Sequence, residues 1–221
     1  MKRDWDARAR ENAMHYVRSE RDHWRLDEFF DSGRESVEAT VAPDLELICG
    51  GRDPKTFRVL EIGCGIGRMT RHLASLFGEI HGVDVSGEMI ARGRELLADV
   101  PNAYLYETNG EDLSVFEDAF FDFAYSFIVL QHIPWRDVVV GYLREVCRTL
   151  RPGSVTKFQV QGIQIAGERD TWVGVGFSQD EMSALADEIG FDVLGTEGAG
   201  TQYFWSLWRR RPDAVLLEPL A

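Results

Sequence analysis

The stretch "VLEIGCGIGRMT", residues 59–70, constrains the fold more than any other part of the sequence. An apolar run that contains Glu61 leads into three glycines at alternating positions, and a helical pattern follows. Glycine permits a tight turn and lets backbone N–H groups approach a ligand closely. The stretch therefore predicts a buried strand, a ligand-binding loop and a helix.

The rest of the chain repeats this alternation of strand and helix patterns. Helical patterns cover 68–77, the residues after Ser86, 135–150 and 178–190. Alternation of this kind indicates a layered α/β fold with a mostly parallel sheet. The last two strands have no helix between them, which favours an antiparallel hairpin at one edge. The predicted strands lie in 57–62, 79–85, 102–108, 121–130, 155–161, 191–198 and 201–210.

The N-terminal residues have helical rather than strand periodicity. Apolar residues recur at helical spacing over residues 4–30, and "DSG" at 31–33 is a typical stop. A second, weaker helix is predicted over 34–49, with an interruption at Pro43. Residues 50–56 are rich in turn-forming residues and link this region to the first strand.

The charge balance bears on the possible partners. Lys and Arg total 24, whereas Asp and Glu total 37, so the net charge is −13. An acidic surface repels phosphate backbones and anionic lipids, so we expect neither a nucleic-acid nor a membrane partner. The basic cluster Arg209–Arg211 is short, and we interpret it as a solvated strand end.

Other absences narrow the class of protein. The sequence has no apolar run of about 18 residues, the length expected of a membrane span, and no apolar segment typical of a secretory signal. Its three cysteines, Cys49, Cys64 and Cys147, are widely separated and odd in number, which favours a reducing, cytoplasmic location. The histidines do not fall at metal-ligand spacing, so we expect no metal site.

An acidic residue at the end of the second predicted strand indicates what the glycine loop, residues 63–67, binds. Asp84 lies 21 residues after Gly63, where a carboxylate can accept both hydroxyls of a ribose. Two features then disfavour a dinucleotide. Glu61 would repel a pyrophosphate, and Arg68 occupies the position where the G-x-G-x-x-G pattern needs glycine. The alternative is that the glycines merely form a tight turn.

From residue 57 to 210 the chain resembles the class I S-adenosylmethionine-dependent methyltransferases, specifically their small-molecule type 11 branch. The resemblance rests on five segments in order: "VLEIGCGIGRMT", "GVDVSGEMI", "NGEDL", "FDFAYSFIVLQHIP" and "VCRTLRPGS". It implies a Rossmann-like, seven-stranded, mostly parallel sheet with an antiparallel terminal strand and helices on both faces. Residues 1–50 would form an N-terminal helical cap or lid, and residues 51–221 the methyltransferase domain.

The resemblance implies S-adenosyl-L-methionine as cofactor, with S-adenosyl-L-homocysteine as product. The glycine loop would hold the methionyl part, Asp84 the ribose hydroxyls and the segment after the third strand the adenine. The family commonly has Asp where this chain has Asn109, and an amide both donates and accepts. The implied cofactor contacts are Glu61, Gly63, Cys64, Gly65, Gly67, Arg68, Asp84, Val85, Met89, Asn109, Gly110, Glu111, Asp112, Phe127 and Ile128.

The acceptor would bind beyond the fourth strand. His132 in "QHIP" is the candidate general base or acceptor contact, with Gln131 as a polar neighbour. A loop-shaping role for His132 ahead of Pro134 is the alternative. The N-terminal helices and residues 159–176 would close the pocket. Its candidate walls are Tyr16, Trp24, Trp135, Gln161, Tyr203 and Trp205.

The sequence thus predicts methyl transfer to an oxygen or nitrogen of a small-molecule acceptor, by a monomer or homodimer. Methylation of a protein or peptide amine is the first alternative, although the segment at 161–178 is short for a protein substrate. A nicotinamide-dependent oxidoreductase and a non-catalytic adenosyl-binding module are further alternatives. A nucleic-acid methyltransferase is disfavoured by the acidic charge.

Overall fold

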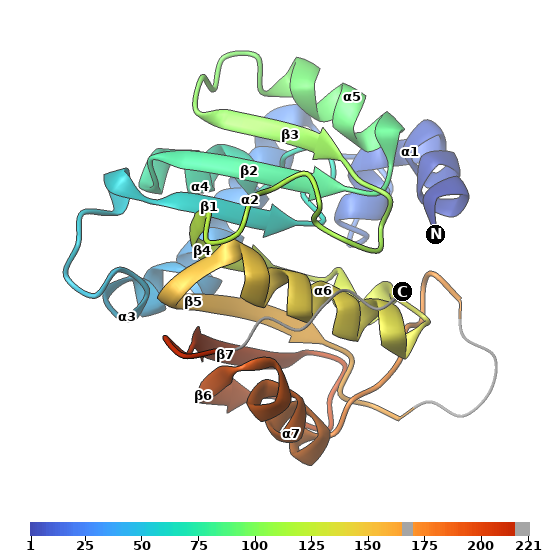
Figure 1. Cartoon of the computed structure of the whole chain (residues 1–221). Helices are drawn as coiled ribbons and strands as arrows, with labels where there is room; N and C mark the ends of the chain where they lie inside the picture. The colour runs from blue at the N-terminus through green and yellow to red at the C-terminus, as the bar shows by residue number, and fades with distance from the viewer. Residues whose placement is uncertain (165–169, 215–221) are drawn as a thin grey trace. The chain divides into compact units, whose positions relative to one another are not determined.

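The structure is a computed structural model that describes residues 1–164 and 170–214 (Figure 1). The chain divides into two compact units, residues 1–109 and 110–221. Three strands lie in the first unit, and four lie in the described part of the second.

The N-terminal unit contains a three-stranded parallel sheet in the order β3-β2-β1. The strands are β1 (Arg58–Ile62), β2 (Glu79–Asp84) and β3 (Ala103–Glu107). Figure 1 shows their three arrowheads directed to the same side, on which α1 lies. The carboxyl ends of these parallel strands, where ligands of α/β sheets bind, therefore lie together.

Two helices follow the glycine loop and β2 as the sequence predicts. α4 covers Thr70–Leu76, and α5 covers Gly87–Leu96. The Ser86 hydroxyl caps α5 by accepting a hydrogen bond from the Met89 N–H. Because the cap satisfies one of the unpaired N–H groups of the first turn, it fixes where the chain enters α5, directly after Asp84 and Val85.

The N-terminal helices differ from the predicted single helix over residues 4–30. α1 ends at Val17 after starting at Lys2, and α2 runs over Leu26–Thr40. Asn12, which has non-helical backbone angles inside α1, donates through Nδ2 to the Asp22 carbonyl at 2.7 Å. Short polar side chains that bond to the backbone compete with helical hydrogen bonds, which explains the break. The Ala42–Asp44 turn and α3 (Leu45–Cys49) follow, consistent with the predicted interruption at Pro43.

The predicted helix stop at 31–33 is wrong, because Gly33 lies inside α2. Its role is close packing rather than termination. A Cβ built on Gly33 would lie 2.0 Å from the Arg68 carbonyl oxygen. Only glycine lets α2 approach the backbone of the glycine loop this closely.

Replacing Gly33 by alanine is expected to destabilise the fold, although alanine is normally the better helix former. The clash with Arg68 should lower the free energy of unfolding by about 1–3 kcal/mol, the range typical of overpacking. Gly141 in α6 (Arg136–Thr149) is the matched control, since its nearest neighbour would be the Glu111 carbonyl oxygen at 3.6 Å. Gly141→Ala should stabilise by about 0.5–1 kcal/mol. Urea denaturation measures both changes, and equal effects would contradict the packing role of Gly33.

The C-terminal unit contains four strands in the order β4-β5-β7-β6. β4 (Phe121–Ser126) is parallel to β5 (Leu150–Val160), and β7 (Phe204–Arg210) is antiparallel to both β5 and β6 (Phe191–Glu197). The predicted antiparallel hairpin of the last two strands is therefore confirmed.

Two helices of this unit also agree with the sequence pattern. α6 covers Arg136–Thr149, and α7 covers Gln179–Ile189. The predicted capping box is present, with the Ser178 and Glu181 side chains each accepting from the other's backbone N–H. Gly190 ends α7 at a φ of 105°, a left-handed conformation that glycine adopts readily.

Two sequence predictions in this unit are wrong. The fifth strand starts at Leu150 rather than 155, because residues that read as a turn form a bulge between the pairs Phe121↔Leu150 and Phe123↔Val155. The Arg209–Arg211 cluster is not a fully solvated strand end. Arg210 is buried, and its guanidinium donates to the Leu150 carbonyl.

Candidate functional site

The carboxylate of Asp84 is fixed by backbone donors at the end of β2. The Gly65 N–H donates to Oδ2 at 3.0 Å, and the Ser86 N–H donates to Oδ1 at 2.9 Å. Burial raises the pKa of Asp84 to about 6, against these two hydrogen bonds, which lower it. Each carboxylate oxygen has a second lone-pair direction, so Asp84 retains capacity to accept from a ligand.

Glu61 lies at the penultimate position of β1, with its side chain buried. Its Oε2 accepts a hydrogen bond of 2.6 Å from the Thr70 hydroxyl at the start of α4. Burial raises the pKa of Glu61 to about 7, while the Thr70 hydrogen bond and the charge of Arg68 lower it. This contact ties the end of β1 to the start of α4, across the glycine loop.

Glu61 should make stability fall as pH rises. Its folded-state pKa of about 7 lies above the ordinary value of 4.5, so the folded protein binds the extra proton between these values. Stability from this group is complete below pH 4.5 and is lost progressively up to about pH 7. In the Glu61→Gln variant the side chain cannot titrate, so this pH dependence of stability is lost.

The stability of Glu61→Gln relative to wild type is therefore expected to rise between pH 4.5 and 7. The rise should approach about 3 kcal/mol, from about 1.4 kcal/mol per pKa unit. Urea denaturation across this pH range measures the difference, with Glu46→Gln, at an exposed position of α3, as control. A difference independent of pH would contradict a raised pKa at Glu61.

Arg68, expected among the cofactor contacts, has its guanidinium directed to α2. The side chain is buried, and Nη1 donates to the Ser32 carbonyl at 2.8 Å and to the Ser36 hydroxyl at 3.0 Å. The contact ties the end of the glycine loop to the N-terminal helices. This explains a large side chain where a dinucleotide loop would need glycine.

The glycine loop also packs closely against two helices. Gly65 has a φ of 55°, and a Cβ there would lie 2.9 Å from Val17 Cγ2 on α1. A Cβ on Gly67 would lie 2.5 Å from Leu97 Cδ1, just past α5. Close packing therefore explains Gly65 and Gly67 as residues of a tight turn, in addition to their predicted role in ligand binding. The remaining loop residues Gly63 and Cys64 donate their N–H groups to the Val83 carbonyl.

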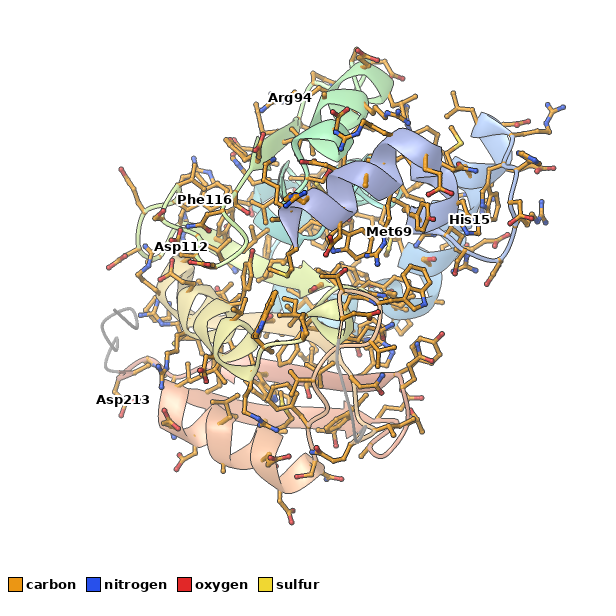
Figure 2. All side chains as sticks on the ribbon, turned by 90° about the vertical axis from the view of Figure 1, so that its right-hand side faces the viewer. His15, Met69, Arg94, Asp112, Phe116 and Asp213 are labelled. Atoms are coloured by element: carbon orange, nitrogen blue, oxygen red, sulfur yellow. The ribbon has the colours of Figure 1, made fainter. Side chains whose placement is uncertain are left out.

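α1 is fastened to the segment that follows Asp84. Asp6 Oδ1 accepts from the Ser86 hydroxyl at 2.7 Å, and Lys2 Nζ lies 2.6 Å from Glu107 Oε1 and 3.5 Å from the Val85 carbonyl. Figure 2 shows α1 on the side of this unit that faces the viewer, with His15 labelled near its C-terminal end. The sequence offered no signal for Asp6 or Lys2, since both read as ordinary charges on a helix.

Three further predicted residues of this unit lie in one hydrophobic cluster. Met89 is buried there, with Tyr16 and Trp24 packed partly buried against it. The Tyr16 hydroxyl donates to Glu11 at 2.9 Å, and Trp24 Nε1 donates to the Arg18 carbonyl at 2.9 Å. The cluster, which also contains Phe29, joins α1, α2 and α5; the predicted ligand contacts of Met89, Tyr16 and Trp24 stay predictions.

The segment after β3 is a turn-rich loop. Asn109 is exposed, and Gly110 has a φ of 79°. Asp112 Oδ1 accepts from the Ser114 N–H at 3.0 Å and from its hydroxyl at 2.6 Å, so this carboxylate stabilises its own turn (Figure 2). Glu111 is exposed, and its adenine contact remains a prediction.

The segment after β4 holds a strained residue. Ile128 has a φ of 55°, which is rare for a β-branched side chain and is typically found where the surroundings enforce it. Its N–H donates to Gln159 Oε1 on β5 at 3.1 Å. Phe127 stacks on Trp205 of β7, with ring centroids 5.4 Å apart and planes at 13°. Sequence reasoning missed Gln159, which reads as one polar residue in a strand.

The two candidate catalytic residues lie in the short helical turn Leu130–His132. His132 Nδ1 lies 2.7 Å from the Trp172 carbonyl, and Gln131 Nε2 lies 3.4 Å from His132 Nε2. A carbonyl only accepts, so Nδ1 carries the proton and Nε2 carries the lone pair. The tautomer is the one a general base using Nε2 requires.

The other predicted acceptor walls differ in exposure. Gln161 is buried, and its Oε1 accepts from the Ile163 N–H at 3.1 Å. Trp135 and Tyr203 are 52% and 49% exposed, so neither is enclosed. Of the segment 159–176 predicted to close the pocket, residues 165–169 lie outside the described residues.

The described residues contain neither a metal-ligand cluster nor a membrane-spanning helix. Within 1–164 and 170–214, no group of three or more His, Cys, Asp or Glu side chains is placed to hold a metal ion. Among the helices the structure describes, none has the length and apolarity needed to cross a membrane.

Comparison with known proteins finds similarity to methyltransferases. Residues 59–153 match a family model described as a methyltransferase domain. The chain is 31% identical to phosphoethanolamine N-methyltransferase 2 of Caenorhabditis elegans, over 63% of this chain and 33% of that protein. It is 37% identical to a ubiquinone biosynthesis O-methyltransferase of Paraburkholderia phymatum, over 43% of this chain and 40% of that protein.

Among solved structures, phosphoethanolamine N-methyltransferase 1 of Haemonchus contortus aligns with a TM-score of 0.71 at 16% identity, over 100% of this chain and 50% of that one. This similarity confirms the Rossmann-like methyltransferase fold. The matched family model and the shared fold are those of methyltransferases, consistent with the resemblance to the class I S-adenosylmethionine-dependent family. The matched regions cover less than half the length of the two curated relatives.

Proposed function

We propose that this chain is an S-adenosyl-L-methionine-dependent methyltransferase that moves a methyl group to an oxygen or nitrogen of a small-molecule acceptor. One observation carries the proposal: the loop that matches the family model is hydrogen-bonded to Asp84, which is the position for a ribose-binding acid. Both curated relatives described above are named as methyltransferases of small molecules.

The residues present fit such a cofactor. Each carboxylate oxygen of Asp84 accepts one hydrogen bond from a backbone N–H group. Each oxygen can accept one more, which is what two ribose hydroxyls require. Glu61 is a buried acid beneath the loop, compatible with a cationic ligand and unfavourable for a pyrophosphate. We assign the ribose hydroxyls to Asp84, the methionyl part to the Gly63–Gly67 loop and the adenine to the Asn109–Asp112 segment.

When bound, the cofactor supplies an electrophilic methyl group. The chain's own residues must orient the acceptor, exclude water and remove a proton from a hydroxyl or ammonium nucleophile. We assign proton removal to His132 Nε2, because the Trp172 carbonyl holds the Nδ1–H and so fixes the tautomer. Gln131, Gln159 and the aromatic pair Phe127 and Trp205 are the residues we assign to acceptor orientation.

We propose that residues 1–50 act as a cap over the cofactor. The Asp6–Ser86 hydrogen bond and the contact of Val17 with Gly65 support this role, because both lie beside Asp84 and the loop. We also propose a cytoplasmic location, supported by three buried cysteines, all of them free thiols.

Transfer of a labelled methyl group from S-adenosyl-L-methionine to a panel of metabolites and short peptides tests the activity. The proposal predicts label in a small molecule. Label in peptides alone would favour the protein-amine alternative. The absence of transfer and of S-adenosyl-L-homocysteine binding would overturn the proposed function.

A further inference from the structure

Two buried amide side chains, Gln131 next to His132 and Gln159 on the adjoining strand β5, each have one atom without a hydrogen-bond partner. Gln159 is 0% exposed, and its Nε2 is unpaired. Gln131 is 2% exposed, and its Oε1 is unpaired. Buried polar atoms are nearly always paired, so two orphans in one region call for a ligand or ordered water.

The hydrogen bonds around these amides identify which atom is the donor and which is the acceptor. Gln159 receives the Ile128 N–H, so the atom that accepts must be the carbonyl oxygen and the orphan is the –NH₂ group. His132 presents the Nε2 lone pair to Gln131, so Gln131 donates and its orphan is the carbonyl oxygen. The region therefore offers one unpaired donor and one unpaired acceptor.

Aromatic rings adjoin the two orphan atoms. Gln159 is paired across the strands with Trp205, which stacks on Phe127, and the Trp172 ring lies 5.4 Å from that of His132. Two charged side chains among the described residues of this region are engaged. Asp170 accepts from the Trp172 and Val173 N–H groups at 2.8 Å each, and Lys157 Nζ lies 5.2 Å over the Trp205 ring.

We infer that the methyl acceptor is a neutral hydroxylated aromatic molecule. Its oxygen accepts a hydrogen bond from Gln159 Nε2. Its hydroxyl hydrogen is bound by Gln131 Oε1 or by His132 Nε2, and it leaves as a proton during methyl transfer. This inference rests on the proposed function and narrows it to O-methylation. A protonated amine has no lone pair for the Gln159 donor, and an anionic phosphate would face the Gln131 carbonyl. A hydroxyl, which both donates and accepts, satisfies both orphans.

The proton balance is complete for a hydroxyl acceptor. The oxygen forms a bond to the methyl carbon as the carbon–sulfur bond of the sulfonium breaks, and the sulfur keeps that electron pair. The hydroxyl proton passes to His132 Nε2, which the Trp172 carbonyl holds in the accepting tautomer; the acceptor hydroxyl takes the place of the long 3.4 Å contact from Gln131 Nε2. Gln159 is then a specificity-determining residue, because its N–H favours oxygen over ammonium at the reacting position.

The test uses the full chain and phenols with one, two and three rings, each paired with the aminomethyl compound of the same ring system, whose amine is protonated at neutral pH. Transfer of labelled methyl groups is expected to at least one phenol and to be at least tenfold slower to its paired amine. Faster transfer to the amines would overturn the inference. So would transfer to none of the phenols while S-adenosyl-L-homocysteine binds, whereas loss of that binding would instead overturn the proposed function.

Gln159→Glu tests the donor directly. The carboxylate keeps an oxygen for the Ile128 N–H and replaces the orphan donor by an acceptor. At pH 8 we expect at least a tenfold fall in kcat/KM for the phenol, with S-adenosyl-L-homocysteine affinity unchanged. Gln202→Glu, at an exposed turn position, is the matched control. An unchanged phenol rate in a folded Gln159→Glu variant would show that water alone satisfies the amide and would overturn the inference.

Discussion

Replacing His132 by alanine is expected to lower kcat by about 10²–10⁴-fold, the usual contribution of a positioned general base. The affinity for S-adenosyl-L-homocysteine should stay within about twofold, because the proposed role concerns the acceptor's proton and not the cofactor. The reason is geometric: the hydrogen bond between His132 Nδ1 and the Trp172 carbonyl leaves Nε2 as the base. Single-turnover kinetics with the acceptor found in the panel, together with calorimetry, separates the two effects.

Two further measurements distinguish a base from a loop-shaping residue. Added imidazole should partly restore the rate of His132→Ala, since a small base can enter the space left by the side chain. His23→Ala, at an exposed position before α2, is the control and should leave the rate unchanged. A wild-type rate in His132→Ala would remove His132 as the base, and a loss of rate that imidazole does not restore would favour the loop-shaping alternative.

Asp84→Ala is expected to weaken S-adenosyl-L-homocysteine binding by about 100-fold or more. Two hydrogen bonds from ribose hydroxyls to a carboxylate would be lost, each typically about 1.5–3 kcal/mol. The variant also loses the acceptor of the Gly65 and Ser86 N–H groups, so the loop itself loses a constraint. Calorimetry measures the affinity, and thermal unfolding reports whether the variant folds.

The same carboxylate should make wild-type binding depend on pH. Its raised pKa of about 6 means that the ionised form, which accepts both hydroxyls, is lost as pH falls through 6. Affinity is therefore expected to fall by up to tenfold for each unit below that value. Asp192→Ala, at an exposed site on β6, should bind like wild type. Equal affinities in Asp84→Ala and Asp192→Ala would contradict the ribose-binding role.

The order of strands and helices was predictable because local signals agree with the final structure. Short apolar runs between glycine-rich turns predicted the strands, and Ser86 and Ser178 predicted two helix starts. The errors involve long-range partners. The break in the first helix depends on the Asn12–Asp22 contact, and the early start of β5 depends on its pairing with Phe121 of β4.

The candidate site was likewise predictable where it depends on local sequence signals and not where it depends on long-range contacts. Asp84 was predictable because an acid at the end of the second strand has a fixed relation to the first loop. The contacts of Arg68 with α2 and of Asp6 with Ser86 were not, because they join segments far apart in the sequence. Gln159 was missed for a similar reason: its partner, Ile128, lies on a different segment and adopts an unusual φ.

Calorimetric titration of the full chain with S-adenosyl-L-homocysteine, and separately with NADH, tests the central claim most directly. The combination of Glu61, the glycine loop and Asp84 predicts saturable binding of S-adenosyl-L-homocysteine and none of NADH. Binding of NADH with no response to S-adenosyl-L-homocysteine would contradict the methyltransferase assignment.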